Sequence, residues 1–227
     1  MDSSGQILAA ADIHREFRTA EGVLSVLKGI DLQVRRKEML AVTGASGVGK
    51  STLLHILGGL DRPTSGEVTL DEIAISHLSE QELARLRNRK VGFVFQSHYL
   101  LDDFSALENA MIPMLLAGRS HAEARRRAEL LMADVGLTDR QSHRPKQLSG
   151  GEQQRVAVAR ALANEPGIVL ADEPSGNLDT ATGRMLHDLL FRLNERNGTT
   201  FVIATHNREL AERCHREIRM ADGRIVV

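Results

Sequence analysis

A glycine-rich stretch, Gly44–Thr52, contains the residue types that hold a phosphate chain. It reads Gly-Ala-Ser-Gly-Val-Gly-Lys-Ser-Thr, with glycines at the first and sixth positions followed by Lys50 and Ser51. Glycines let backbone N–H groups approach an anion without a clash from Cβ, and the positive end of a following helix adds to the attraction. Lys50 would reach the outer phosphates, while the Ser51 hydroxyl would be a Mg²⁺ ligand. The stretch predicts binding of a nucleoside triphosphate.

Two adjacent carboxylates follow an apolar run later in the chain, where Ile168–Ala171 ends at Asp172 and Glu173. A carboxylate pair at a strand end is costly to bury unless it faces a metal ion or a cleft. Beside a phosphate loop, the pair predicts that Asp172 joins Ser51 around Mg²⁺ and that Glu173 polarises an attacking water. An exposed acidic turn without a chemical role is the alternative interpretation.

A second helix start suited to an anion lies at Ser149-Gly150-Gly151-Glu152. The spacing of Ser149 and Glu152 is that of a capping box, which predicts a helix through about Ala163. The two glycines leave the first N–H groups of that helix accessible, at its positive end. Because this start lies about a hundred residues beyond Gly44–Thr52, one nucleotide cannot easily contact both within a single subunit.

Four short apolar runs position these residues. Each run ends at polar residues: Met39–Val42 at the phosphate loop, Val91–Phe95 at Gln96, Ile168–Ala171 at Asp172, and Phe201–Ala204 at Thr205-His206. Near-continuous apolar runs are typical of parallel strands that helices cover on both faces. Such sheets bind ligands at the carboxyl ends of their strands. The sequence therefore predicts an α/β fold with a parallel-sheet core.

Other elements are expected around this core. Residues 7–17 and 23–34 predict two antiparallel strands around a turn at Thr19–Gly22, and helices are expected to fill most of 97–160. Asp179 is expected to cap a further helix. We expect one domain over residues 1–227, divided into a catalytic core with a β sub-domain (1–96 and 161–227) and an inserted helical sub-domain (97–160).

Composition excludes several classes of protein. The 227 residues carry a net charge of −1, which gives no general attraction to nucleic acid or to an anionic membrane. The single cysteine, Cys214, excludes an internal disulfide. No apolar stretch approaches the roughly 18–20 residues of a spanning helix, and Met1–Gln6 lacks the features of a signal peptide. We expect a cytosolic protein that reaches a membrane only through a partner.

Taken together, the motifs resemble those of the ATP-binding-cassette (ABC) ATPases. Leu148–Gln154 is similar to the signature motif of that family. Gln96, Ser175–Asp179 and His206 are similar to its Q-loop glutamine, its D-loop and its switch histidine. Phe17 stands where the family usually has a tyrosine that stacks on adenine, and the aromatic face is kept without the hydroxyl. The resemblance implies a P-loop NTPase (RecA-like) core.

The resemblance also implies an ATP hydrolase of the ABC translocase type. Two copies would dimerise head to tail around two ATP molecules with Mg²⁺, so that the loop of one copy faces the signature of the other. Lys50, Gln96, Glu173 and His206 would be catalytic, and Ser51, Gln96 and Asp172 would hold the metal ion. Contacts to ATP would come from Phe17, Gly44, Ala45, Ser46, Gly47, Val48, Gly49, Lys50, Ser51, Thr52, Ser149, Gly150, Gly151 and Asp179.

Residues 95–109 resemble the branch of the family that releases lipoproteins from the bacterial inner membrane. That resemblance implies permease subunits of the LolC/LolE type docking near residues 97–116, on apolar side chains such as Leu100 and Phe104. The cassette would be peripheral, at the cytoplasmic face of the inner membrane, with no nucleic-acid partner. The same residues also suit a MacB-type exporter cassette, or an FtsE-like regulatory cassette with a cell-division partner. Packing inside a helical sub-domain is the alternative explanation for the apolar side chains.

Overall fold

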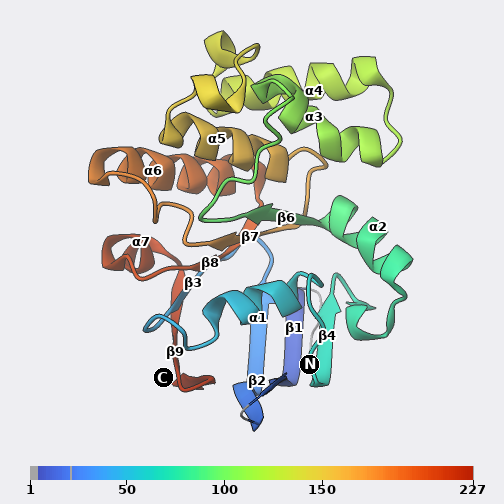
Figure 1. Ribbon diagram of the computed structural model, residues 1–227, viewed down its shortest axis with the longest axis vertical. Helices are drawn as coiled ribbons and strands as arrows, with labels where there is room; N and C mark the ends of the chain where they lie inside the picture. Colours follow the sequence, from blue (N-terminus) through green and yellow to red (C-terminus); the bar gives the residue numbers. More distant parts are fainter. Residues whose placement is uncertain (1–4, 21, 227) are drawn as a thin grey trace.

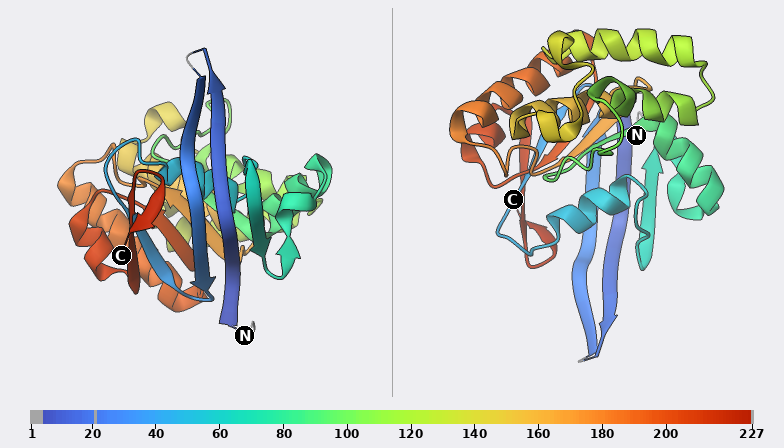
Figure 2. Two further views of the ribbon diagram at one scale, coloured as in Figure 1. Left: turned by 90° about the horizontal axis from the view of Figure 1, so that it is seen from below. Right: turned by 45° about the horizontal axis from the view of Figure 1, so that its top comes forward.

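The computed structural model describes residues 5–20 and 22–226 (Figures 1 and 2). Residues 1–4, Glu21 and Val227 lie outside the described part, and so do most of the Met1–Gln6 start and one residue of the expected Thr19–Gly22 turn. Within the described ranges, no helix combines the length and the apolar character that crossing a membrane requires.

A six-stranded sheet runs through the middle of the described chain. Its strand order is β10 (Arg224–Val226), β9 (Arg216–Ala221), β3 (Met39–Thr43), β8 (Thr200–Ala204), β7 (Ile168–Asp172) and β6 (Val91–Val94). All neighbours pair in parallel except β10, which returns antiparallel to β9. The carboxyl ends of the parallel strands therefore share one edge of the sheet.

Both faces of this sheet are buried, which is the physical reason for the near-continuous apolar runs. Along β7, Ile168 and Leu170 join the hydrophobic core on one face, whereas Val169 and Ala171 join the core on the other. Successive side chains of a strand point to opposite faces, so a strand covered on both sides needs an apolar residue at every position. The predicted parallel-sheet core is confirmed.

Four more strands form an antiparallel sheet in the order β2 (Gly22–Arg35), β1 (Gln6–Thr19), β4 (Ser65–Leu70) and β5 (Ile73–Ala74). The inner side chains of β1, β2 and β4 share one hydrophobic core with the helix that follows β3. Figure 2 shows β1 and β2 as a long ribbon that extends beyond the body of the molecule. The two predicted N-terminal strands are confirmed, and residues 65–74 add two strands that the sequence did not indicate.

The helices divide between the two faces of the six-stranded sheet (Figure 1). Helices α1 (Lys50–Leu57) and α2 (Glu80–Lys90) pack into the core shared with the antiparallel sheet. The opposite core is formed by α3 (Ala106–Leu116), α4 (His121–Asp134), α5 (Gly150–Ala161), α6 (Thr180–Asn197) and the short α7 (Arg208–Arg213). Capping boxes open α2, α3, α4 and α5. The structure therefore places α1 and α5 on opposite faces of the sheet.

Candidate functional site

The Gly44–Thr52 loop joins the carboxyl end of β3 to α1. Gly44 has φ +145°, and a Cβ at this position would lie 2.4 Å from the carbonyl oxygen of Met220, so only glycine fits. Gly49, with φ +101°, is the N-cap of α1, and within the described part of the chain no side chain caps the first N–H groups of that helix. Those N–H groups point toward the loop with their hydrogen-bonding capacity available to an anion.

Lys50 is folded over this loop. Its Nζ donates to the carbonyl oxygens of Gly44, at 2.9 Å, and Ala45, at 3.0 Å, and the residue is only 8% exposed. Both acceptors are backbone carbonyls rather than carboxylates, so the ammonium charge is not neutralised by them. A largely buried charge of this kind is favourable only beside an opposite charge, and the loop is therefore suited to an anion.

Asp172 ends β7, and its buried Oδ1 has no hydrogen-bond partner among the residues that the structure describes. Buried carboxylate oxygens normally accept a hydrogen bond or coordinate a cation. Helix α1 packs against β7, so Asp172 and the exposed Ser51 come from neighbouring elements. Carboxylate and hydroxyl oxygens are ligands that Mg²⁺ accepts, and the free Oδ1 fits such an ion.

Glu173 and His206 are brought into direct contact. The Nδ1 atom of His206 lies 2.9 Å from Oε1 of Glu173, and the backbone N–H of His206 approaches Oε2 at 3.4 Å. The Glu173 side chain is 17% exposed, against 73% for His206. Glu173 also has φ +45° and donates its N–H to the carbonyl of Ala204 at 2.9 Å. A left-handed conformation is strained for a residue other than glycine, and such strain is concentrated at functional sites.

Gln96 lies beyond the end of β6 and forms a reciprocal pair with Asn177. Its Nε2 donates to Oδ1 of Asn177 at 3.0 Å, and Nδ2 of Asn177 donates to the carbonyl of Gln96 at 3.1 Å. Asp179 instead caps α6 by accepting from the N–H groups of Ala181 and Thr182. Hydrogen bonds from Thr182 hold the pKa of Asp179 below its usual range. The Asp179 carboxylate is thus engaged at the α6 start, not at the phosphate loop.

The Ser149–Gly151 segment opens α5 beside the start of α6. Ser149 accepts from the N–H of Glu152 at 3.3 Å, and the Glu152 carboxylate accepts from the N–H of Ser149 at 2.8 Å. A Cβ on Gly151 would lie 2.3 Å from Cγ2 of Thr182. Because α5 and α1 pack into different cores, one chain does not bring Ser149–Gly151 to the phosphate loop.

Phe17 lies on β1 and is 37% exposed. The Arg15 guanidinium carbon is 4.3 Å from the ring centroid, and Arg15 also forms an ion pair with Asp61 at 2.9 Å. Residues two apart on a strand share a face, so Arg15 could have been found from its spacing to Phe17. One ring face is covered by a fixed cation, which leaves the other face as the surface for a base.

Two further residues fasten α5 to the segment that carries Gln96. Gln154, only 2% exposed, donates from Nε2 to the carbonyl of Phe95 at 2.8 Å. Arg160 donates to the carbonyls of His98, at 2.7 Å, and Tyr99, at 2.6 Å. Gln154 lies inside the signature-like motif, whereas nothing in the spacing of Arg160 indicated its contacts. The helix that starts at Ser149 is therefore hydrogen-bonded to residues 95–99.

Comparison with known proteins agrees with this geometry. The sequence profile described as "ABC transporter" matches residues 27–176. The chain belongs to the ABC transporter family. The lipoprotein-releasing system ATP-binding protein LolD of Syntrophus aciditrophicus is 54% identical, covering 89% of this chain and 91% of the relative. The LolD of Aquifex aeolicus is 51% identical, covering 97% of this chain and 96% of that protein.

Solved structures of ABC cassettes have the same fold. The dimeric post-hydrolysis state of the ATP-binding cassette MJ0796, bound to ADP and Pi, aligns with a TM-score of 0.90 and 40% identity over 97% of both chains. Another dimeric structure of MJ0796 aligns with a TM-score of 0.91. The resemblance drawn from the motifs and the predicted P-loop NTPase fold are both confirmed. This ABC cassette binds and hydrolyses ATP.

Proposed function

We propose that this chain is the ATP-hydrolysing subunit of a membrane complex that releases lipoproteins from the bacterial inner membrane. The observation that carries the proposal is the likeness to LolD proteins, which reaches 51% identity over 97% of the chain. The activity is that of an ATP-driven translocase, with LolC/LolE-like permease subunits as partners. The cassette is peripheral and lies at the cytoplasmic face of the inner membrane.

In this proposal the residues at the carboxyl edge of the sheet divide the chemistry of ATP hydrolysis. The loop Gly44–Thr52 and Lys50 hold the outer phosphates, and the unneutralised Lys50 ammonium supports that role. Ser51, Gln96 and Asp172 hold Mg²⁺, which neutralises charge on the phosphates; the free Oδ1 of Asp172 supports this set. Phe17 stacks on adenine through the face that Arg15 leaves uncovered.

Glu173 accepts a proton from the attacking water, and His206 contacts the γ-phosphate. The 2.9 Å contact holds the two side chains together at the carboxyl edge of the sheet, so each residue helps to position the other. A residue at the end of a strand does not ordinarily need a positive φ. The strained φ of +45° at Glu173 is consistent with a carboxylate that is held in place for a reaction.

The second half of each site comes from a second copy of the chain. Ser149–Gly151 lie away from the phosphate loop of their own chain, as the separate packing of α1 and α5 indicates, and Asp179 caps α6, which packs into the same core as α5. A head-to-tail dimer around two ATP molecules supplies them in trans, and the solved MJ0796 cassettes are dimeric. ATP then closes the dimer, because its affinity for the closed pair is greater than its affinity for the separated chains.

The permease subunits dock near residues 97–116. The structure divides the apolar side chains of this segment: Leu107, Met111 and Met114 are buried in the core, whereas others remain exposed, namely Tyr99, Leu101, Phe104, Leu115 and Leu116. Exposed apolar clusters of this kind mark protein contacts. We also propose residues 97–160 as a helical sub-domain, because α3, α4 and α5 pack against one another.

The proposed chemistry is tested with a Glu173→Gln variant. Loss of the carboxylate removes the proton acceptor, so we expect ATP hydrolysis to fall about 10²–10⁴-fold, while the affinity for ATP stays within about twofold. The control is Glu195→Gln, which makes the same carboxylate-to-amide change at an exposed position of α6. Unchanged turnover in Glu173→Gln would show that another group activates the water.

The proposed partner is tested by purifying tagged Glu173→Gln cassette from native membranes with ATP present. Recovery of two LolC/LolE-like permeases together with lipoproteins supports lipoprotein release. Recovery of a MacB-type exporter or a cell-division protein overturns the substrate and leaves the ATPase chemistry intact. A parallel purification with Leu101→Ser and Phe104→Ser added is expected to lose the permeases, since both substitutions remove exposed apolar contacts.

A further inference from the structure

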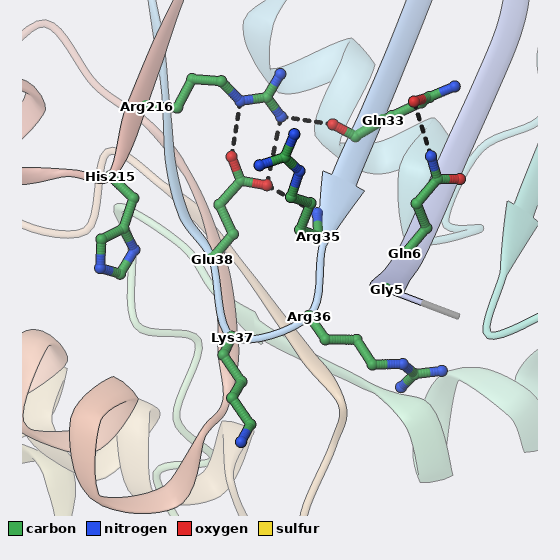
Figure 3. Close-up of a pocket in the computed structure, with 9 residues that line it drawn as sticks. All are labelled: Gly5, Gln6, Gln33, Arg35, Arg36, Lys37, Glu38, His215 and Arg216. Atoms are coloured by element: carbon green, nitrogen blue, oxygen red, sulfur yellow. Dashed lines mark hydrogen bonds and ion pairs between the residues drawn. The ribbon is translucent and has the colours of Figure 1, made fainter. Parts of the chain in front are cut away.

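Two buried titratable side chains of the described chain, Glu38 and His187, do not belong to the predicted ATP-site residues. Glu38 lines the cavity of Figure 3, where its carboxylate accepts from the guanidinium of Arg216 at 2.7 Å and from the backbone N–H of Arg35, also at 2.7 Å. These two bonds explain the burial of Glu38, because a charged group inside a protein needs a partner. The burial of His187 needs a different explanation.

His187 lies on α6 and is only 2% exposed. Its Nε2 lies 2.8 Å from Oγ of Ser175, whereas its buried Nδ1 has no partner among the residues that the structure describes. Burial lowers the pKa of His187 below its ordinary value of 6.5, so the ring is uncharged at neutral pH. An unpaired buried nitrogen costs free energy that an apolar side chain of similar size would not. The benefit of histidine at this position is therefore its bond to Ser175.

Ser175 lies two residues after Glu173, in the turn that leads from β7 to α6. The N–H of Gly176 closes this turn by donating to the carbonyl of Glu173 at 2.9 Å. Helix α6 meets the turn with two residues that are four positions apart and therefore share one face of the helix. At Gly183 a Cβ would lie 3.5 Å from Cβ of Ser175, and His187 binds the Ser175 hydroxyl. The bond thus fixes the middle of the turn to the helix.

Glu173 has a backbone conformation that depends on such support. Its φ of +45° is costly for a residue other than glycine, and it persists only where the surrounding structure holds the chain. Before Glu173, the pairing of β7 with β8 holds the backbone, and the Glu173 N–H donates to the last carbonyl of β8 at 2.9 Å. After Glu173, the next side-chain hydrogen bond along the described chain is that of Ser175 with His187. Losing this bond would release the backbone on one side of Glu173.

We propose that His187 is a positioning residue for ATP hydrolysis, which holds Ser175 and thereby keeps the Glu173 carboxylate in place beside the attacking water. The inference rests on the proposed role of Glu173 as the proton acceptor. Glu173, Ser175, His187 and His206 line one cavity of about 180 Å³, so the imidazole borders the space that the carboxylate faces. A proton acceptor must lie within hydrogen-bond reach of the water. A small movement of the turn therefore lowers turnover and leaves the binding of ATP unchanged.

The test compares ATP hydrolysis by purified variants at a temperature where each of them is folded. His187→Leu removes the bond to Ser175, and we expect kcat to fall about 10–10²-fold, with the affinity for ATP within about twofold of the parent. His187→Gln is expected to keep kcat within about threefold of the parent, because a side-chain amide offers Ser175 both a donor and an acceptor. A residue that only fills space would be replaced better by leucine than by glutamine, so the order of the two variants separates positioning from packing.

Two further variants complete the series. Ser175→Ala is expected to lower kcat as much as His187→Leu, and combining the two should lower it no further, because both remove the same bond. The control is Asn194→Leu, near the other end of α6, which removes a buried amide that donates to the carbonyls of Lys37 at 3.0 Å and Thr199 at 2.7 Å. This control should lower the melting temperature and leave kcat unchanged.

Glu173→Gln, measured in the same series, separates failure of this inference from failure of the proposed function. A low kcat in Glu173→Gln beside a normal kcat in His187→Leu overturns the role of His187 and leaves that of Glu173 standing. Normal turnover in Glu173→Gln removes the proposed proton acceptor and, with it, the inference. Equal kcat in His187→Leu and His187→Gln, or losses that multiply when His187→Leu and Ser175→Ala are combined, also overturns the positioning role.

Discussion

Lys50, Asp172 and Glu173 are each unfavourable in the folded chain when considered alone. Lys50 holds a largely buried charge against carbonyl groups, Asp172 buries an oxygen without a donor, and Glu173 occupies a left-handed conformation. Each feature costs free energy. All three lie at the carboxyl edge of the parallel strands, where a triphosphate and a divalent cation would relieve the first two. At the scale of single residues, the candidate site is therefore marked by residues whose placement costs free energy.

His187 gives a prediction for the dependence of stability on pH. The residue is 2% exposed, and Nε2 lies 2.8 Å from Oγ of Ser175. Burial lowers the pKa of His187 from its ordinary value of 6.5, so the unfolded chain takes up a proton that the folded chain refuses. The free energy of unfolding should therefore fall as the pH drops below about 6.5, by at most about 1.4 kcal/mol per pH unit from this group.

Thermal unfolding from about pH 7.5 to about pH 5.5 measures this effect. The slope of melting temperature against pH should be shallower in His187→Gln than in the parent, whatever the absolute stability of the variant. His121→Gln, at an exposed position, should keep the parent slope. A residual slope is expected because burial also lowers the pKa of His98. Equal slopes in His187→Gln and His121→Gln would exclude His187 as a source of the pH dependence of stability.

Helix α5 joins the Ser149–Gly151 segment, which our proposal places at the ATP site of a second copy, to the proposed permease contact. Its first residues follow Ser149, and its later side chains Gln154 and Arg160 bind the carbonyls of residues 95, 98 and 99. A rigid helix with contacts at both ends transmits displacement from one end to the other. Helix α5 therefore links two regions of the chain, and no single residue of the Leu148–Gln154 motif indicates this link.

Replacing Arg160 with methionine tests this connection. One half-buried carbonyl, that of His98, and one exposed carbonyl, that of Tyr99, lose a charged donor, so the free energy of unfolding should fall by about 1–2 kcal/mol. The amide of Leu101, which bonds to Asn109 at 2.8 Å, should exchange its hydrogen faster as the segment loosens. Arg155→Met is the control on the same helix, because Arg155 reaches the carbonyl of Val135 only at 3.5 Å. Equal exchange in both variants would mean that Arg160 does not hold residues 98–101.

At the scale of the whole molecule, the sheet separates two helix starts that can each hold an anion. One belongs to α1 and packs with the antiparallel sheet; the other belongs to α5 and packs with α3, α4 and α6. Figure 1 shows these helices on opposite sides of the sheet. A single chain thus supplies half of each proposed site, and in our proposal a second copy supplies the other half.

A Ser149→Arg substitution in the Glu173→Gln chain tests whether the second copy supplies that half. With ATP, the Glu173→Gln chain should sediment as a dimer, and with ADP as a monomer. Ser149→Arg should keep the chain monomeric with ATP while ATP binding persists, because the phosphate loop is in the same chain and unchanged. Ser120→Arg removes an equivalent capping serine at α4 and should still dimerise. Parallel loss of ATP binding and dimerisation in Ser149→Arg would place the signature in the same chain's site.

Short-range pattern was sufficient where the physical cause is local. The burial of β7 on both faces follows from its unbroken apolar run, and the capping box at Ser149 follows from hydrogen bonds between residues three apart. Residues 65–74 gave no clear signal, because β4 depends on pairing with β1 and the two-residue β5 depends on pairing with β4. Helix α7 is six residues long, too short for a periodic pattern.

By itself the sequence determined the family and the parallel core, and it predicted the candidate ATP-site residues, since these depend on residue types at fixed spacing. Only the tertiary structure decided which residues meet. Gln96 pairs with Asn177 across 81 positions, Arg216 with Glu38 across 178, and Arg160 with the carbonyls of His98 and Tyr99. Such contacts arise because the parallel order of the strands brings distant loops to the same edge, a consequence of the whole chain's packing that no local window contains.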